Sequence, residues 1–294
     1  MPEPDTAVHA VSTRAPCRLV DYLRARLIVT PARAVGPLIA RGGVQLGGAR
    51  GQIADLVRTG DAIAIDRAAL VDVLEPEPWS LVIHHEDDDF LVVDKPAGVH
   101  VHPQGPHRTG TLLGALLWHA GARPDLPWGA WRPSLAHRLD RATSGLITIA
   151  KHAAAHEAFR ALLDRRAVVR RYRAVVVGDL VRDRGTIDAA LGRDPTRTYR
   201  QAVVADGKHA VTHWRVIARP GAHTVVELEL ETGRTHQIRA HLACLGHPIA
   251  GDVLYASAGA PATQIALHAT TLEFVQPMSG ALIQCRSEPA VDYR

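Results

Sequence analysis

The sequence predicts an α+β fold, in which helices are interspersed among strands. From residue 81 onward the chain is rich in short apolar and β-branched segments that are typical of strands. Residues 153–169 are rich in Ala and Leu, and residues 238–245 carry an apolar stripe, so both segments predict helices. These helices do not alternate regularly with the strands, which favours the α+β class over successive βαβ units.

Four strands of this larger part can be placed from the sequence. They lie at residues 90–93, 146–150, 172–177 and 226–230. The last is the clearest, because apolar residues alternate there with glutamates, as expected for a half-buried strand. We find no internal repeat and no low-complexity tract.

The composition is that of an ordinary soluble protein with one or two domains. The chain has 294 residues, of which 47% are apolar and 22% charged, enough to bury a core. It contains no apolar run long enough to span a membrane, and its N-terminus lacks the apolar stretch of a signal peptide. Three distant cysteines form no CxxC pair, which argues against a zinc ribbon or a disulfide framework. We therefore expect a cytoplasmic protein.

Composition divides the chain into four parts. They are a disordered leader over residues 1–16, a small module over residues 17–67, a linker over residues 68–80 and a larger domain over residues 81–294. The leader and the linker contain prolines and few periodic apolar residues. The module holds eight Arg and four Asp and so carries the net charge of +4, while the rest is balanced. Arginine binds phosphate well, although a GC-rich coding genome also favours arginine over lysine.

The small module is predicted to contain two helices and two strands. Leu19, Leu23 and Leu27 recur at four-residue spacing and indicate the first helix. A second helix is expected over residues 34–40. Strands are expected at residues 44–46 and 61–65, with a glycine turn after the first.

The first candidate site is the cluster at residues 137–146, HRLDRATSGL. Asp140 lies between Arg138 and Arg141, just before a predicted strand. A carboxylate near guanidinium groups stays ionised, which suits a nucleophile or a base. A surface ion pair on a polar loop is the alternative, and the residue types alone do not choose between the two.

The second candidate site follows the turn at Gly233. Thr235 is expected to cap the helix that begins there. Arg234 then lies near the helix start, and Arg239 lies one turn inside, beside the apolar stripe of Ile238. Arg239 is therefore either a solvated side chain or a buried partner for a carboxylate.

Both clusters resemble signature sequences of the RluA-type pseudouridine synthases. Residues 137–146 match the HRLDxxTSGL signature, and residues 233–252, GRTHQIRAHLACLGHPIAGD, match a later one. Further matching blocks occur along the chain in the same order as in the family and extend the resemblance over residues 81–289. They lie at residues 91–98, 102–103, 171–176, 207–212 and 267–274.

The resemblance implies a mixed, largely antiparallel sheet with a central RNA cleft, and an isomerase that needs no cofactor. Such enzymes detach uracil from C1′ of a uridine in RNA, rotate it and rejoin it through C5. Asp140 is implied as the nucleophile, attacking either the sugar or the base, and Arg239 as its ion-pair partner. Tyr172 is implied to stack on the base and to help remove the C5 proton, directly or through a water.

The resemblance also implies a set of RNA contacts. Arg138 would fill the space that a flipped base leaves behind, because the glycosidic bond is unreachable inside a stacked helix. Lys95 and Lys208 either contact phosphate or cap turns. The remaining expected RNA-binding residues are Arg141, Arg234, His236, Gln237, Ile238 and, in the small module, Arg41.

Metal and nucleotide sites are not expected. The run of His, Glu and Asp at residues 84–89 lacks the regular ligand spacing of a metal site. The chain has neither a GxxxxGK[ST] nor a GxGxxG motif. His137 is expected to be a structural hydrogen-bond partner rather than a base.

The small module resembles the RNA-binding module named after ribosomal small-subunit protein S-four. The matching segments lie at residues 18–23, 38–48 and 57–65. The sequence departs from that pattern at Pro37, inside the second helix, and at Gly47, where the pattern has Asn. The resemblance implies phosphate contacts, and a small packing domain with solvated arginines is the alternative.

We predict a monomeric RNA pseudouridine synthase with RNA as its partner, no membrane contact, no cofactor and no metal. The small module favours large-subunit (23S) ribosomal RNA over transfer RNA as the substrate. The competing hypothesis is a non-catalytic RNA-binding or ribosome-assembly protein built on the same scaffold.

Overall fold

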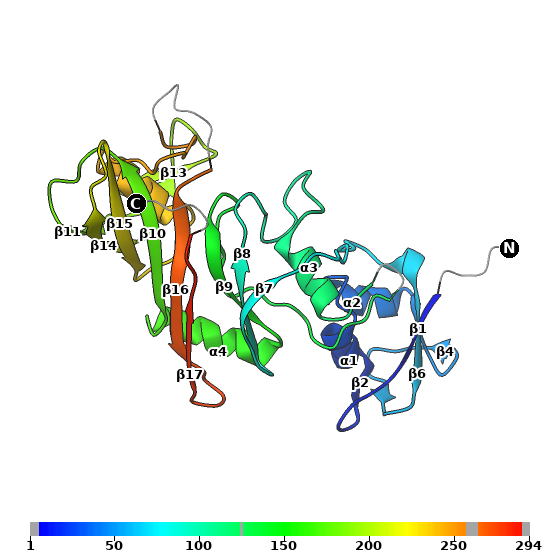
Figure 1. Ribbon diagram of the computed structural model, residues 1–294. Coiled ribbons are helices and arrows are strands. Elements are labelled where there is room, and N and C mark those ends of the chain that lie inside the picture. The colour runs from blue at the N-terminus through cyan, green and yellow to red at the C-terminus, as the bar shows by residue number, and fades with distance from the viewer. Residues whose placement is uncertain (1–5, 124–125, 257–263, 290–294) are drawn as a thin grey trace. The chain divides into compact units, whose positions relative to one another are not determined.

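A computed structural model describes residues 6–123, 126–256 and 264–289. Its contacts divide the chain into two compact units. The N-terminal unit combines residues 1–80 with residues 102–134, and the large unit combines residues 81–101 with residues 135–294. Figure 1 shows the elements of both in chain order. None of the helices in the described ranges has the length and hydropathy that a membrane crossing requires.

The N-terminal unit contains a four-stranded sheet in the order β1-β6-β3-β4, with antiparallel pairs. Its elements are β1 (Thr6–Ala10), β2 (Cys17–Arg18), α1 (Leu19–Arg26), α2 (Ala32–Ala40), β3 (Val44–Leu46), β4 (Ala49–Arg50), β5 (Leu56–Val57), β6 (Ala62–Asp66), the short 3₁₀ helix η1 (Arg67–Ala69) and α3 (Leu112–His119). Helix α2 continues past Pro37, where it loses one backbone donor. Both predicted helices and both predicted strands of the module are present.

Two observations in this unit differ from the predicted division. Strand β1 lies within the expected disordered leader, where it pairs with β6 and buries Ala7. Residues 102–134 pack with the N-terminal residues, since the Trp128 ring stacks on His9 at 4.5 Å. Arg132 donates hydrogen bonds to carbonyl oxygens at and beyond the end of α1, including those of Arg24 at 2.6 Å and Thr30 at 2.9 Å. These long-range contacts have no local sequence signal.

The large unit is built on one mixed sheet. Among the described residues nine strands form it, in the order β11-β14-β15-β10-β16-β9-β8-β7, with β17 paired to β16. All neighbours are antiparallel except β16 and β9. The strands are β7 (Val82–Glu86), β8 (Phe90–Lys95), β9 (Ser144–Ala150), β10 (Val169–Val177), β11 (Arg184–Asp188), β14 (Val211–Ala218), β15 (His223–Leu230), β16 (Leu267–Val275) and β17 (Leu282–Arg286). The predicted α+β class with a mixed, largely antiparallel sheet is confirmed.

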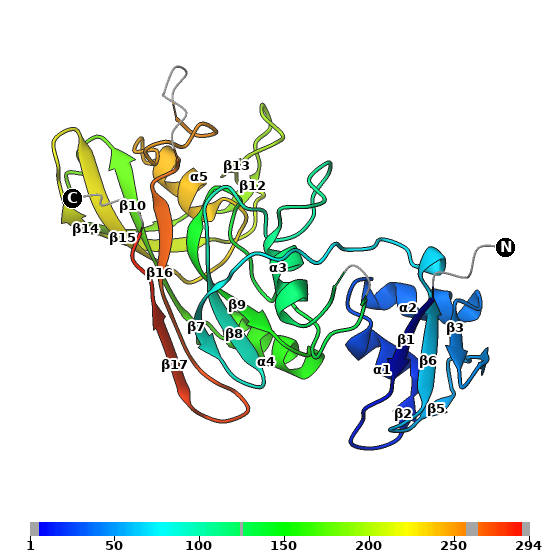
Figure 2. The same ribbon diagram turned by 45° about the vertical axis from the view of Figure 1, so that its right-hand side comes forward.

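Two helices and a separate hairpin complete the large unit. Helix α4 (Ala153–Asp164) packs on the sheet through Phe159, whose ring lies 4.9 Å from that of Phe274. It ends earlier than predicted, because Arg166 adopts a left-handed conformation and the β-branched residues that follow enter β10. Helix α5 (Gln237–Cys244) lies beside the hairpin of β12 (Leu191–Arg193) and β13 (Gln201–Val203), as Figure 2 shows.

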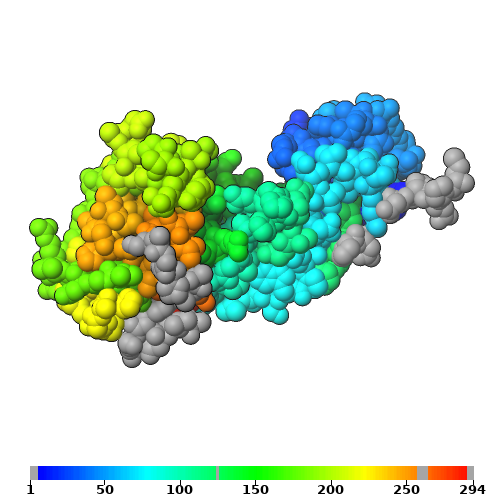
Figure 3. Space-filling view, turned by 90° about the horizontal axis from the view of Figure 1, so that it is seen from above, coloured from blue at the N-terminus to red at the C-terminus, as the bar shows by residue number. Residues whose placement is uncertain are grey.

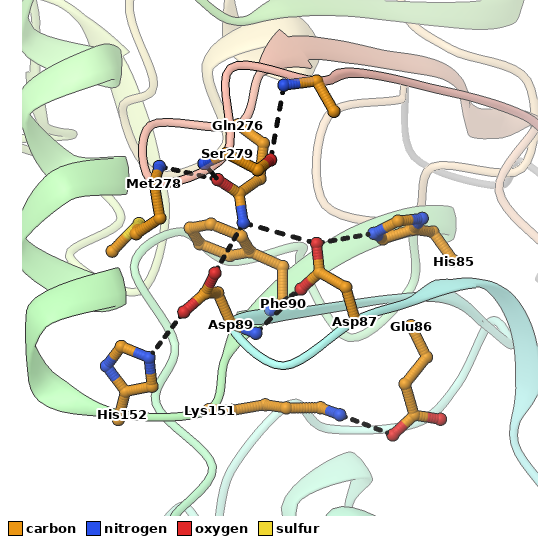
Figure 4. A network of polar contacts seen from close by, with 11 residues as sticks. His85, Glu86, Asp87, Asp89, Phe90, Lys151, His152, Gln276, Met278 and Ser279 are labelled. Carbon is orange, nitrogen blue, oxygen red and sulfur yellow. Dashed lines mark hydrogen bonds and ion pairs between the residues drawn. The ribbon is translucent and has the colours of Figure 1, made fainter.

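The acidic run at the turn between β7 and β8 forms a structural junction (Figure 4). Asp89 accepts hydrogen bonds from Gln276 at 2.6 Å and contacts His152 at 2.8 Å. Asp87 contacts His85 at 3.1 Å and accepts hydrogen bonds from backbone N–H groups of its own turn. These contacts tie the turn to the segment after β16 and to the start of α4. In the described ranges, no group of three or more His, Cys, Asp or Glu side chains is arranged to hold a metal ion.

Candidate active site

The candidate nucleophile Asp140 lies on a loop that is held from both sides. The loop ends at Gly145, whose φ is +108° and whose missing Cβ would lie 2.4 Å from the carbonyl oxygen of Ala269. Only glycine allows β9 to approach β16 so closely. On the other side, the backbone N–H of Gly98 donates to the carbonyl of Arg141 at 2.8 Å. The side chain of Asp140 remains 15% exposed.

Lys95 clamps this loop from inside the unit. Its ammonium group is fully buried and donates to the carbonyl oxygens of Pro96 at 2.8 Å, Val99 at 3.0 Å and Arg141 at 3.2 Å. Burial lowers the pKa of Lys95 to about 8, while the charges of Asp140 and Asp94 act in the opposite direction. Of the two alternatives for Lys95, these bonds to carbonyl oxygens correspond to the capping of turns and not to a phosphate contact, because the charge does not reach the surface.

Arg239 lies between two carboxylates. Its Nε and Nη2 donate to the two oxygens of Asp252 at 2.7 and 2.8 Å, and its Nη1 donates to Oδ2 of Asp140 at 3.1 Å. The side chains of Arg239 and Asp252 are 5% and 0% exposed. Burial acts to lower the pKa of Arg239, but hydrogen bonds and charge from Asp252 and Asp140 raise it. The guanidinium is therefore a permanent, fixed cation beside Asp140.

The start of α5 fixes the position of Arg239. The side chain that holds this helix start is not the predicted Thr235 cap. The residue before the helix is His236, in a left-handed conformation with φ of +54°, and it makes no capping hydrogen bond through its side chain. Gln237 instead locks the helix start: its Nε2 donates to the carbonyl of Val211 at 2.9 Å, and its Oε1 accepts from the N–H of Arg234. Gln237 is only 3% exposed, so its amide is used inside the protein rather than for the expected RNA contact.

His236 approaches the candidate nucleophile. Its Nε2 lies 3.9 Å from Oδ2 of Asp140, and its Nδ1 lies 3.1 Å from the hydroxyl of Tyr255. Burial lowers the pKa of His236, and the charge of Asp140 raises it. A non-glycine residue with positive φ is strained, and such strain is found at functional sites when the surroundings hold it.

Tyr172 lies on β10 and is buried, with 7% of its surface exposed. Burial raises the pKa of Tyr172, Arg170 lowers it and Asp140 raises it again, so the phenol lies within electrostatic reach of the candidate nucleophile. With a raised pKa the hydroxyl stays protonated at neutral pH. Tyr172 is therefore not a free phenolate base.

The other predicted site residues divide by exposure. Ile238 is buried on α5 with 5% of its surface exposed. His137 accepts a hydrogen bond from the N–H of Thr148 at 2.8 Å, and burial lowers the pKa of His137 to about 3. The residues that stay exposed in the large unit are Arg138, Arg141, Arg234 and Lys208. Arg41 is exposed in the N-terminal unit.

Two residues of this site were not singled out from the sequence. Asp252 closes the matching block at residues 233–252, and that position was the only available signal for it. Tyr255 lies just beyond the block and covers Arg239, with the guanidinium carbon 5.2 Å from the ring centre.

Comparisons with known proteins identify the family. A family model described as RNA pseudouridylate synthase matches residues 89–244. The Uncharacterized RNA pseudouridine synthase YlyB of Bacillus subtilis is 43% identical over 235 residues, which are 78% of this chain and 76% of that protein. Ribosomal large subunit pseudouridine synthase D of Pseudomonas aeruginosa is 41% identical over 227 residues, which are 72% of this chain and 69% of that protein.

A solved structure shares the fold. Human RNA Pseudouridylate Synthase Domain Containing 1 superposes with a TM-score of 0.60 at 27% identity, covering 73% of this chain and 87% of that one. The matched residues of the family model include Asp140, Tyr172 and Arg239. The chain therefore belongs to the RluA-type family of RNA pseudouridine synthases.

Proposed function

We propose that this pseudouridine synthase acts on large-subunit (23S) ribosomal RNA, with Asp140 as its nucleophile and without a cofactor. The observation that carries the proposal is the position of Arg239 between Asp140 and Asp252. The target is suggested by the Pseudomonas aeruginosa relative, whose name assigns it to the large ribosomal subunit and which is 41% identical over 72% of this chain.

The reaction is an isomerisation, so the substrate and the product contain the same atoms. The bond from N1 of uracil to C1′ of the ribose breaks, a bond from C5 to C1′ forms, and the proton lost from C5 is matched by one gained at N1. No electrons are gained or lost overall, so the chemistry requires no redox partner. What the protein must supply is a nucleophile, a place for the flipped base and a route for the proton.

Asp140 is suited to the nucleophilic step. Arg239 is fixed in a bidentate contact with Asp252, so only its Nη1 faces Asp140. A guanidinium shared with a second carboxylate places a positive charge beside Asp140 without fully neutralising it. The carboxylate can then attack either the ribose or the base, and both pathways begin at the same oxygen atoms.

Tyr172 is suited to hold the base. Because its pKa is raised, we propose that the neutral ring stacks on uracil and that the C5 proton leaves through a water positioned by the hydroxyl. Arg138 is exposed two residues before Asp140, where it can stack in the gap that the flipped nucleotide leaves.

We further propose that residues 17–67 of the N-terminal unit form an S-four-like module that contacts RNA. Its helices α1 and α2 pack together, and they carry exposed Arg24 and Arg33, with Arg41 directly after α2. Replacing Arg33 and Arg41 by Glu is expected to weaken binding to ribosomal RNA and to lower its salt dependence. Unchanged affinity at every salt concentration would contradict an RNA-binding role for this unit.

Release of tritium tests the proposed function. Large-subunit ribosomal RNA and transfer RNA are transcribed with uridine labelled at C5 and incubated with the full chain, dialysed against a chelator. We expect label to enter water from the ribosomal RNA alone. Release from transfer RNA alone would contradict the proposal that ribosomal RNA is the substrate. Dependence on added metal would contradict the proposal that the reaction needs no cofactor.

A further inference from the structure

A loop of the large unit carries an isolated aromatic side chain at the surface. The loop, residues 194–200, joins β12 to β13, and Tyr199 in it is 66% exposed. Of the Phe, Tyr and Trp side chains that the structure describes, only Tyr199 is largely exposed. In Figure 3 the yellow-green atoms of this part of the chain stand at the surface, next to the orange atoms of the segment after α5.

The loop is held in one shape by Asp194, which is 4% exposed. Its carboxylate accepts hydrogen bonds from the N–H and hydroxyl of Thr196 at 2.8 and 2.7 Å, from the N–H of Arg197 at 3.1 Å and from Nε of Arg200 at 2.6 Å. These hydrogen bonds, those of Thr196 first, hold the pKa of Asp194 well below its usual range. Tyr199 is thus exposed on an ordered support, which lowers the entropy lost when a ligand binds.

The same loop is joined to the candidate active site. Arg200 donates to the carbonyl of Leu254 at 2.9 Å. The hydroxyl of Tyr255 donates to the carbonyl of Gln201 at 3.0 Å and lies 3.1 Å from His236, which is itself 3.9 Å from Asp140. A ligand held at the loop would therefore lie at a fixed distance from the reacting nucleotide.

The charges on the loop are available to a ligand. Arg193 at the end of β12 and Arg197 within the loop both precede Tyr199, both are exposed, and neither forms an ion pair with any residue that the structure describes. By contrast, the exposed Arg171 of β10 and Arg215 of β14 are paired with Glu229 and Glu227. An exposed ring with two unpaired guanidinium groups on the same short segment suits single-stranded RNA, which offers a base to stack and neighbouring phosphates.

We propose that residues 193–199 form a binding site for an unpaired nucleotide of the substrate RNA, separate from the pocket of the reacting uridine. Tyr199 stacks on its base, and Arg193 and Arg197 bind the adjacent phosphates. The proposal rests on the proposed function for its RNA substrate and adds a second point of attachment that fixes the strand relative to Asp140.

Binding of a fluorescein-labelled oligouridylate to the full chain, measured by anisotropy over a range of salt concentrations, separates the two contacts. Tyr199→Ala is expected to weaken binding about tenfold with the salt dependence unchanged, because stacking releases no counterions. Tyr199→Trp keeps a ring and is expected to bind as well as the parent. Arg197→Ala is expected to lower the slope of log affinity against log salt by about 0.7, the value for one phosphate on a single strand.

Two controls complete the experiment. Arg160→Ala, at an exposed position of α4, is the matched loss of charge and is expected to leave the affinity for oligouridylate unchanged. An RNA duplex of the same length is expected to bind the parent and Tyr199→Ala equally, since its bases are already stacked. In tritium release, Tyr199→Ala is expected to raise KM with kcat retained.

The proposal is overturned if Tyr199→Ala and Arg197→Ala both bind oligouridylate like the parent. It is also overturned if Tyr199→Ala loses affinity for duplex and single strand alike. Neither outcome touches the proposed function, which fails instead if the parent protein releases no tritium from ribosomal RNA.

Discussion

Arginine–carboxylate pairs occur in two settings in the large unit, one inside it and one on the exposed face of its sheet. On the exposed face, Arg171 pairs with Glu229 at 2.8 Å, with side chains 44% and 45% exposed. Inside, Arg239 pairs with Asp252 at 2.7 Å, with side chains 5% and 0% exposed. The shortest distances are nearly the same, but the interior pair is bidentate and is shielded from water, while the exposed pair is joined by one hydrogen bond.

That difference changes how much each ion pair contributes to stability. In water an ion pair of this type contributes about 0–1 kcal/mol, because solvent and salt screen it. In the interior, removal of one partner costs about 3–5 kcal/mol, because the other charge stays buried without compensation. The exposed pair lines a shallow groove of about 670 Å³ together with Arg184 and Arg215. Its glutamates neutralise part of that charge, so arginine content alone does not mark an RNA site.

The largest effect is expected from breaking the interior pair. Asp252→Ala leaves the guanidinium of Arg239 partly uncompensated, and we expect the free energy of unfolding to fall by about 3–5 kcal/mol. Denaturation by urea measures this loss, and tritium release measures the accompanying loss of turnover. Asp252→Asn keeps the size and one acceptor and serves as the control. A loss below 1 kcal/mol for the Ala variant would place this pair with the exposed ones.

A second effect concerns the buried cation Lys95. Its folded pKa, about 8, lies below its value of 10.5 in an unfolded chain, so the unfolded state binds more protons between these pH values. The free energy of unfolding should therefore rise with pH in this window, by roughly 3 kcal/mol at most, relative to Lys95→Met. Urea denaturation of both proteins from about pH 7.5 to 10.5, which spans the two pKa values, measures the difference between their free energies of unfolding. A difference that stays flat with pH would show that the ammonium is not desolvated.

The smallest effect is expected on the exposed face. A double-mutant cycle with Arg171→Ala and Glu229→Ala should give a coupling energy of about 0–1 kcal/mol, and high salt should remove it. Turnover should match that of the parent. A coupling energy like that of the interior pair, or a loss of turnover, would break the distinction between the two settings.

The sequence predicted the fold class and most strands, because local patterns such as the alternation at residues 226–230 carry that information. It did not predict strand β1, whose short apolar residues give a weak pattern, or the packing of residues 102–134 with the N-terminal unit. The latter depends on contacts such as Trp128 with His9, which are distant in sequence.

Site residues that lie in the matching family blocks could be predicted from the sequence. The role of a residue could not be predicted where it depends on whether the side chain is buried. The partnership of Arg239 with Asp140 follows from the resemblance, and the structure places their atoms 3.1 Å apart. Gln237 was expected at the RNA surface and Lys95 either there or capping a turn, yet both are buried and bonded to backbone groups. A sequence shows which groups can form hydrogen bonds, but only the folded chain shows whether solvent, RNA or the backbone receives them.

The central claim is that Asp140, held by Arg239, carries the reaction. Single-turnover tritium release from large-subunit ribosomal RNA by Asp140→Asn tests it most directly, with Asp164→Asn, at the exposed end of α4, as the matched control. We predict no release by Asp140→Asn, an RNA affinity within a few fold of the parent, and full activity of the control. Release by Asp140→Asn at the rate of the parent would contradict the claim.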